Sequence, residues 1–162
     1  MRTRWLVVIT LLCTACDGIP RDAAGGLHRI VDGEVRVGAS NNPPWISIAD
    51  GQVGGLEAEL IEGWAHALGA RVVWRVGAVA ELTEAVHRRE LDVLAAGLDE
   101  STPHGKRVAL TQSYLETTGR SGKQHRHVLA VTQGENALLL SLDRYLARQN
   151  EVSLLNRVAV AE

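Results

Sequence analysis

The chain has 162 residues, of which 46% are hydrophobic and 22% are charged. This composition supports one packed domain and excludes wholesale disorder. The 17 basic and 19 acidic residues give a formal net charge of −2, so there is no electrostatic reason to expect a nucleic-acid partner. The only cysteines are Cys13 and Cys16, so the body of the chain can form neither a disulfide nor a thiolate metal site.

The first residues have the pattern of an export signal. The basic start Met1–Arg4 precedes the apolar run Trp5–Leu12, which is too short to span a bilayer because a spanning helix needs about 20 residues. Small residues then lead to Cys16, and this arrangement resembles a bacterial lipobox, in which the cysteine is lipidated and becomes the new N-terminus. An ordinary signal peptide with an incidental cysteine is the alternative.

We therefore expect a lipoprotein signal peptide at residues 1–15, a lipid anchor at Cys16 and a tether over residues 16–33, which are rich in Gly, Pro and charge. This predicts a protein of the periplasm or cell envelope that is attached to a membrane. Asp17, directly after the anchor, resembles a retention signal for the inner membrane in some bacteria.

The remaining sequence alternates strand and helix patterns. An apolar residue at every fourth position of Leu56–Leu68 predicts a helix, which Gly69 ends. The other patterns predict, in chain order, strands at residues 34–39, 71–76, 91–96 and 127–131, short strands at 108–110 and 113–115, helices at 79–89 and from an N-cap at Asn136 to about residue 149, a polar loop at 117–126, and a short helix or frayed tail at 152–160.

This alternation predicts an α/β fold with a mostly parallel sheet flanked by helices. Several segments also follow one another in the order of a known family: Val35–Gly38, Asn42–Trp45, Gly55–Leu60, Leu68–Gly69, Leu91–Gly97 and Lys106–Thr111. Together they make the sequence similar to the bacterial extracellular solute-binding proteins of family 3, the periplasmic receptors of ABC-type uptake systems for polar amino acids. The resemblance implies a lobe of the type II periplasmic-binding-protein fold.

The resemblance also implies that one lobe is missing. In this family the chain crosses to a second lobe and then returns, and Val128–Asn136 resembles the returning segment. We expect a single lobe at residues 34–162, with a loop at 117–126 in place of the second lobe. Two-lobe receptors bury their ligand by closing the cleft, so a single lobe would hold a small polar ligand on an open, hydrated face.

The positions that contact the ligand in the family are altered. Asn42 and Val79 stand where many members have an aromatic residue that lies against the ligand. Trp45 occupies an aromatic position after two prolines, which in the family more often packs within the lobe than touches the ligand.

The segment after the third long strand departs further from the family. Gly97 is retained, but Asp99 stands at the position of a hydroxyl residue and His104 at that of an arginine that clamps the ligand carboxylate. A neutral histidine is a poor substitute for a bidentate arginine, and an aspartate repels an α-carboxylate. The sequence therefore argues against ordinary amino-acid binding.

Asp99, Glu100 and His104 could instead form a site for a cation, an amine or a metal, or could be solvated charges of a loop. His125 and His127 lack a third metal ligand nearby in the sequence.

No arrangement of a nucleophile, a base and an acid stands out. Glu57 and Glu59 fall in the first turn of a predicted helix, where their expected role is interaction with the helix dipole.

We predict a non-catalytic, solute-binding-like lipoprotein with a degenerate amino-acid site, without a cofactor or a bound metal. Its partners would be the membrane and a small polar or cationic solute. The alternative is an interaction or regulatory module whose open cleft face meets a membrane protein or a second copy of the chain. Joint exposure of Trp45 and Trp74 would favour that alternative, and an enzyme derived from the same fold is a remote third reading.

Overall fold

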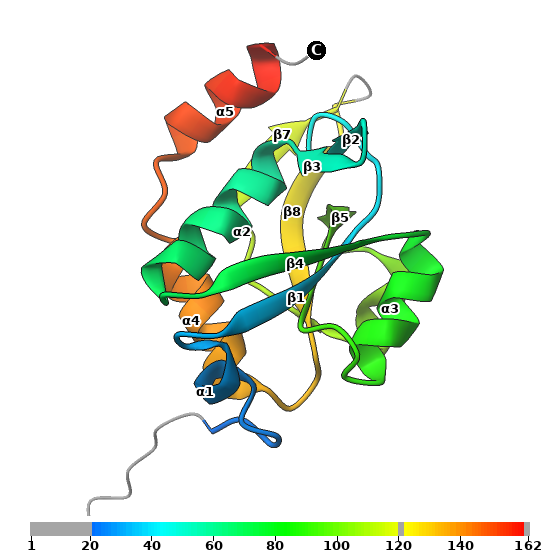
Figure 1. Ribbon diagram of the computed structural model, residues 1–162. Coiled ribbons are helices and arrows are strands. Elements are labelled where there is room, and N and C mark those ends of the chain that lie inside the picture. Colours follow the sequence, from blue (N-terminus) through cyan, green and yellow to red (C-terminus); the bar gives the residue numbers. More distant parts are fainter. Residues whose placement is uncertain (1–20, 120–121, 161–162) are drawn as a thin grey trace, which may run out of the picture.

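The computed structural model describes residues 21–119 and 122–160 (Figure 1). The predicted signal peptide, Cys16 and the first part of the predicted tether lie outside these residues. The elements in chain order are α1 (Gly26–Ile30), β1 (Glu34–Ala39), β2 (Ser47–Ala49), β3 (Gln52–Gly54), α2 (Leu56–Ala67), β4 (Arg71–Val76), α3 (Val79–His87), β5 (Val93–Asp99), the 3-10 helix η1 (Pro103–Lys106), β6 (Ala109–Leu110), β7 (Leu115–Thr118), β8 (Gln124–Val131), α4 (Asn136–Leu146) and α5 (Glu151–Val160).

The main sheet has the strand order β4-β1-β5-β8-β6, and β7 pairs with β8. Strands β4, β1 and β5 are parallel, whereas β8 runs antiparallel to β5, β6 and β7. The predicted α/β class is thus confirmed, and the structure has the form of one lobe. A separate small hairpin, β2–β3, forms at the turn around Asp50 and Gly51.

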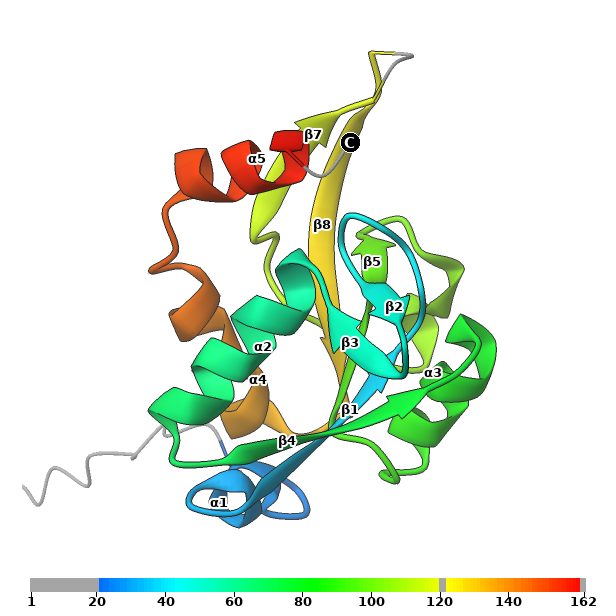
Figure 2. The same cartoon turned by 45° about the horizontal axis from the view of Figure 1, so that its top comes forward.

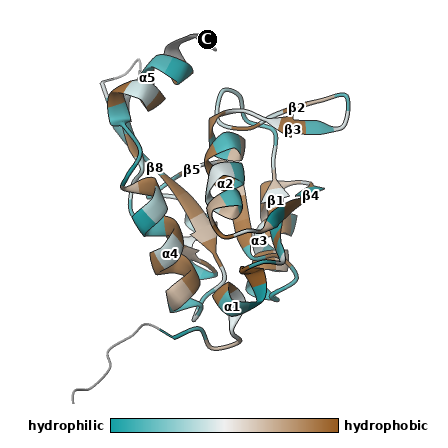
Figure 3. Cartoon of the chain, turned by 60° about the vertical axis from the view of Figure 1, so that its left-hand side comes forward, coloured by the Kyte–Doolittle hydropathy of each residue, from teal (hydrophilic) through white to brown (hydrophobic). Residues whose placement is uncertain are grey.

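Helices cover both faces of the sheet because the central strands are apolar on both sides (Figure 1). In β5, Val93 and Ala95 pack with α2 and α4, whereas Leu94 and Ala96 pack with α3. Strand β8 divides its residues in the same way, and Figure 3 shows hydrophobic colour on β8 and on the first turns of α4. Each strand therefore serves two cores.

The N-terminal segment corrects one prediction. The tether expected over residues 16–33 is folded in its described part, where α1 forms and Ile30 is fully buried. The side chain of Glu135 accepts hydrogen bonds from the backbone N–H groups of Ala24 (3.0 Å) and Gly26 (2.8 Å). Residues 21–33 thus belong to the lobe, because Glu135, in the loop before α4, satisfies two of their backbone N–H groups.

Asp22 also changes the predicted start of the last long helix. Asn136 was expected as the N-cap, but it is the first helical residue of α4, and no neighbouring side chain caps this end. Instead Asp22 Oδ1 accepts hydrogen bonds from the N–H groups of Ala137 (2.6 Å) and Leu138 (2.9 Å). A cap supplied from so far along the chain leaves no local signature in the sequence.

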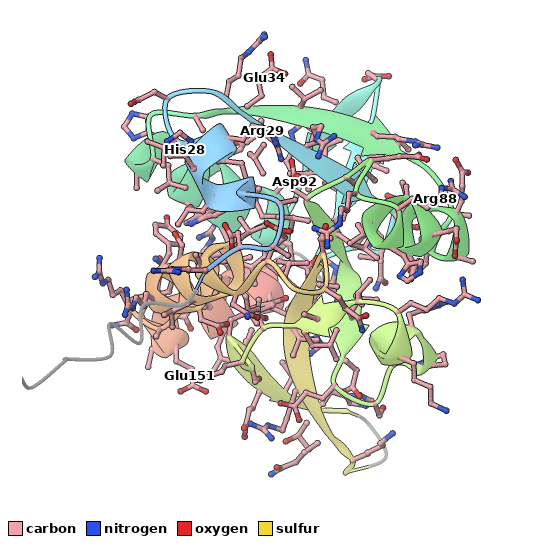
Figure 4. The ribbon with its side chains drawn as sticks, turned by 90° about the horizontal axis from the view of Figure 1, so that it is seen from below. His28, Arg29, Glu34, Arg88, Asp92 and Glu151 are labelled. Atoms are coloured by element: carbon pink, nitrogen blue, oxygen red, sulfur yellow. The ribbon has the colours of Figure 1, made fainter. Side chains whose placement is uncertain are left out.

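Two buried carboxylates hold the base of the lobe together. Asp92 is 4% exposed, and its Oδ1 accepts a hydrogen bond from Arg36 Nη2 at 2.8 Å. Asp92 also forms an ion pair with Arg29 of α1. Figure 4 shows Arg29 reaching from α1 toward Asp92. Glu135, also 4% exposed, pairs with Arg89. Burying a carboxylate is costly unless it is paired, and these arginines supply the partners.

The segment at residues 117–126 corrects a second prediction. It was expected to be a loop, but the end of β7 and the start of β8 lie within it and pair as an antiparallel hairpin, with Thr118 opposite Gln124. The backbone N–H of Gly119 donates to the carbonyl of Lys123 at 2.8 Å. The free ends of these two strands extend beyond β5 (Figure 2).

The last helix, α5, packs against β7 and α2, and Arg157 pairs with Glu59. None of the helices in the described part of the chain combines the length and the apolar character needed to cross a bilayer.

Candidate functional site

The carboxyl ends of β1 and β5 lie at one edge of the sheet and bring three predicted site residues together. The amide Nδ2 of Asn42 donates to the carbonyl of Ala96 at 2.9 Å. Gly97 has a φ of 61°, and a Cβ atom at this position would lie 2.6 Å from Cδ1 of Trp45. Asn42 and Trp45 therefore close directly over a glycine, which both the backbone angle and the close approach require.

A buried acid lies beneath this group. Glu57, in the first turn of α2, is fully buried, and its carboxylate accepts hydrogen bonds from Gly97 N (3.0 Å) and the hydroxyl of Tyr114 (2.7 Å). Burial raises the pKa of Glu57 to about 7, although the hydrogen bonds from Gly97 and Tyr114 oppose the rise. The pKa of Tyr114 is raised well above its usual value because the hydroxyl is buried next to this acid.

His127 of β8 completes the edge. Its ring stacks on Trp45, with 3.7 Å between ring centroids and 28° between planes. Its Nε2 lies 2.8 Å from Thr117 Oγ1, while its buried Nδ1 has no hydrogen-bond partner among the described residues. Burial lowers the pKa of His127 to about 4, so the stacked imidazole is neutral at physiological pH.

Asp99 lies next to this group, opposite His127 in the β5–β8 pairing. Its carboxylate accepts hydrogen bonds from the hydroxyl and the N–H of Ser101, and from Arg126 N at 3.2 Å. These bonds, those to Ser101 foremost, lower the pKa of Asp99 to about 2. Asp99 is therefore charged at any physiological pH, while its side chain remains 25% exposed.

The other two predicted site residues lie elsewhere. Val79, at the start of α3, packs with the apolar cluster of that helix, and its carbonyl accepts from Thr83 Oγ1 at 2.7 Å. His104 lies in η1, where its N–H contacts Thr102 Oγ1 at 3.4 Å. Within the described residues, neither side chain is hydrogen-bonded to Asn42, Trp45 or Gly97. The edge thus contains the charged carboxylate of Asp99, with His125 Nδ1 at 3.3 Å from its Oδ2, and the neutral imidazole of His127.

Three residues of this edge were not predicted as site residues. Glu57 was expected to interact with the dipole of its helix, His127 was considered only as a metal ligand without a third partner, and Tyr114 was not singled out. A glutamate that follows a glycine pair at a helix start gives no signal of burial, because the partners Gly97 and Tyr114 come from distant segments. The described residues contain no group of three or more His, Cys, Asp or Glu side chains that could hold a metal ion.

Comparison with known protein families shows to which family the lobe belongs. The profile of the bacterial extracellular solute-binding proteins, family 3, matches residues 35–158. The chain belongs to this family.

Two solved structures show the same fold at low sequence identity. One is the arginine-bound form of domain 1 of TmArgBP, with a TM-score of 0.65 and 22% identity, covering 75% of this chain and 98% of that one. The other is the ancestral amino acid-binding protein AncCDT-1, a precursor of cyclohexadienyl dehydratase, with a TM-score of 0.69 and 13% identity, covering 83% and 97%.

A curated relative carries a different kind of name. The membrane-bound lytic murein transglycosylase F of Vibrio cholerae serotype O1 is 32% identical over 103 residues, which are 62% of this chain. The matched region is only 19% of the length of that relative.

Proposed function

We propose that the chain is a non-catalytic binding module of the cell envelope, anchored by lipid at Cys16, whose altered ligand face takes a small cationic solute. The observation that carries this proposal is Asp99, which is charged and partly exposed where the family has a hydroxyl residue. A cation or amine can pair with it, whereas the carboxylate of a free amino acid meets repulsion.

The rest of the edge supports an altered site. Asn42 stands where many family members present an aromatic face to the ligand, and its amide is bonded to the carbonyl of Ala96, while Trp45 stacks on His127. The likeness to domain 1 of TmArgBP supports two parts of the proposal. That structure is a single domain in an arginine-bound form.

A thermal-shift series on the full chain tests the ligand class. Putrescine, agmatine, arginine, lysine and glutamate are compared. A ligand present at 100 times its Kd should raise stability by about 2.7 kcal/mol. We expect the amines without a carboxylate to stabilise the chain at least as well as arginine, and glutamate to have no effect. Asp99→Asn should abolish the shift, whereas Asp50→Asn in the exposed β2–β3 turn should preserve it. Stabilisation by glutamate would contradict the proposal, and so would a series in which none of the compounds stabilises the chain.

The anchor is tested separately. Labelled palmitate should enter the wild-type chain and should be lost with Cys16→Ser, while Cys13→Ser keeps the label. Label that persists after Cys16→Ser excludes this cysteine as the anchor.

A second candidate function is a regulatory module for a membrane-bound protein. It is favoured by the relative named as a membrane-bound murein transglycosylase, in which the matched region is a small part of a longer chain. Trp45 and Trp74 give it less support, since both are partly buried against the core. Crosslinking in native membranes should then join the module to a larger envelope protein, and recovery of the module alone argues against this function.

The enzyme alternative gains little from Glu57. The pKa of this buried acid is raised to about 7, but both of its carboxylate oxygens are occupied by Gly97 and Tyr114. These contacts support a structural role at the end of β5.

A further inference from the structure

A groove of about 370 Å³ lies on the flank of the lobe, far from the edge formed by Asn42, Trp45 and Gly97. It is bounded by α1, the end of α2 and the outer face of α4. Leu27, Trp64, Leu68 and Tyr145 contribute an apolar floor. The indole N–H of Trp64 is already bonded to Ser141 Oγ at 3.2 Å, so this floor offers little free hydrogen-bonding capacity.

Two arginines stand over this floor. Arg144 and Arg148 line the groove one helical turn apart, at and just beyond the end of α4, and both are exposed. Most arginines of the described residues pair with a carboxylate. Arg144, Arg148 and Arg21 form no such pair within that part of the chain. The groove therefore combines apolar surface with positive charge that is not neutralised by the lobe itself.

The groove also lies where the chain enters the lobe. Asp22 accepts hydrogen bonds from the backbone N–H groups of Leu27 (2.7 Å) and Ala137 (2.6 Å), and both of these residues line the groove. Asp22 is the sixth residue after Cys16, so an extended chain places Asp22 at most about 22 Å from the anchor. The folding of residues 21–33 makes this link short.

We propose that this groove is a docking site for anionic phospholipid headgroups of the membrane that carries the anchor. Arg144 and Arg148 bind the phosphate, and the apolar floor takes the glycerol backbone and the first methylenes of an acyl chain. The geometry of the proposal rests on the proposed anchor at Cys16. The headgroup is the occupant favoured here because the groove joins positive charge with apolar surface and lies within a short chain length of the bilayer.

Co-sedimentation with vesicles tests the site without the anchor. The full chain with Cys16→Ser, which cannot be lipidated there, is mixed with vesicles of phosphatidylcholine alone or with added phosphatidylglycerol. We expect Arg144→Gln with Arg148→Gln to weaken partitioning into the phosphatidylglycerol vesicles by about 30-fold, since each basic side chain near an anionic surface contributes about a factor of five. Leu140→Gln, at the apolar lining, should weaken it further.

A matched control removes the same charge elsewhere. Arg88→Gln with Arg107→Gln changes two exposed arginines on the side of α3 and η1. This pair should bind the vesicles nearly as well as the Cys16→Ser chain. An equal loss in both double variants, or binding that ignores phosphatidylglycerol, overturns the site.

Two further outcomes also count against it. A dimer in solution that only Arg144→Gln with Arg148→Gln disrupts would assign the groove to a second copy. A loss of folding stability in that variant without any loss of vesicle binding would assign the arginines to the α4 dipole. Palmitate labelling of the wild-type chain is read independently, so failure of the anchor and failure of the groove are distinguishable.

Discussion

Glu57 and His127 are buried titratable groups whose pKa values shift in opposite directions. The raised pKa of Glu57 favours folding at low pH, where the acid is protonated, and this contribution is lost as the pH rises through about 7. The lowered pKa of His127 works the other way. Its contribution is present above the unfolded value of 6.5 and is lost as the pH falls through about 4. The two effects oppose each other in one pH window.

Glu57→Gln removes the first effect. Ionisation of the buried Glu57 should lower the unfolding free energy of the wild-type chain by about 3 kcal/mol between about pH 5 and about pH 8. The Glu57→Gln variant should lack this decrease. Urea unfolding at both pH values measures the difference. Glu59→Gln, in the same turn but exposed, is the control, and an unchanged slope in Glu57→Gln would contradict the assignment.

His127→Gln removes the second effect. In the wild-type chain the neutral imidazole should raise the unfolding free energy by about 2 kcal/mol between about pH 4 and about pH 6.5, after allowance for partial solvation. The His127→Gln variant should lack this rise. NMR titration of the wild-type imidazole offers a direct check. A His127 signal that titrates near its ordinary pKa would show that the Trp45 stack does not desolvate the ring.

Gly97→Ala tests the close approach at the edge of the sheet. Its positive φ and the contact with Trp45 should together cost about 3 kcal/mol of unfolding free energy. Gly51→Ala has a similar φ of 76° but open space around it, so it should cost about 1 kcal/mol. Equal losses in urea unfolding would mean that only the backbone angle matters at Gly97.

At the residue scale, the family resemblance singled out Gly97, Asn42 and Trp45 as candidate ligand positions. In the structure Asn42 and Trp45 lie against Gly97, and their role in binding a ligand stays a prediction. Glu57 and His127 could not be found in this way. Their burial depends on contacts with Gly97, Tyr114 and Trp45 that only the folded sheet creates.

At the scale of elements, Asp22 links the N-terminal segment to two helices. Asp22→Ala should cost about 1–2 kcal/mol, because the first N–H groups of α4 lose their acceptor. Hydrogen exchange of the Ala137 and Leu138 amides should accelerate at the same time. Arg21→Ala, one residue away and exposed, should change neither quantity. Unaltered exchange in Asp22→Ala would show that water caps the helix equally well.

Strands and helices with strong periodicity were predicted close to their observed bounds. The stripe over Leu56–Leu68 became α2, and the apolar run that begins at Leu91 became the buried β5. The hairpin β7–β8 was missed because the outer half of β8 is polar and its pairing partners lie on other strands. The folded N-terminal segment was missed because its glycines and charges resemble a flexible linker, while its support comes from Asp22 and Glu135.

At the scale of the whole molecule, the boundary of the lobe lies earlier than predicted. A chain that starts at Glu34 loses Ile30 from the core and leaves Asp92 without Arg29. We expect it to be at least about 4 kcal/mol less stable than a chain that starts at Arg21, or not to fold cooperatively. Thermal and urea unfolding of the two chains decide this, and equal stability would restore residues 21–33 to the tether.

The hairpin formed by β7 and β8 has a consequence for engineering. Its two strands are fixed by pairing up to Thr118 and Gln124, and Gly119 is bonded to Lys123 across the turn. A foreign domain whose own termini lie close together could therefore be inserted between Gly119 and Lys123 without disturbing either core. The lobe would then hold the inserted domain rigidly. A fluorescent domain inserted there would report on the edge formed by Asn42, Trp45 and Gly97.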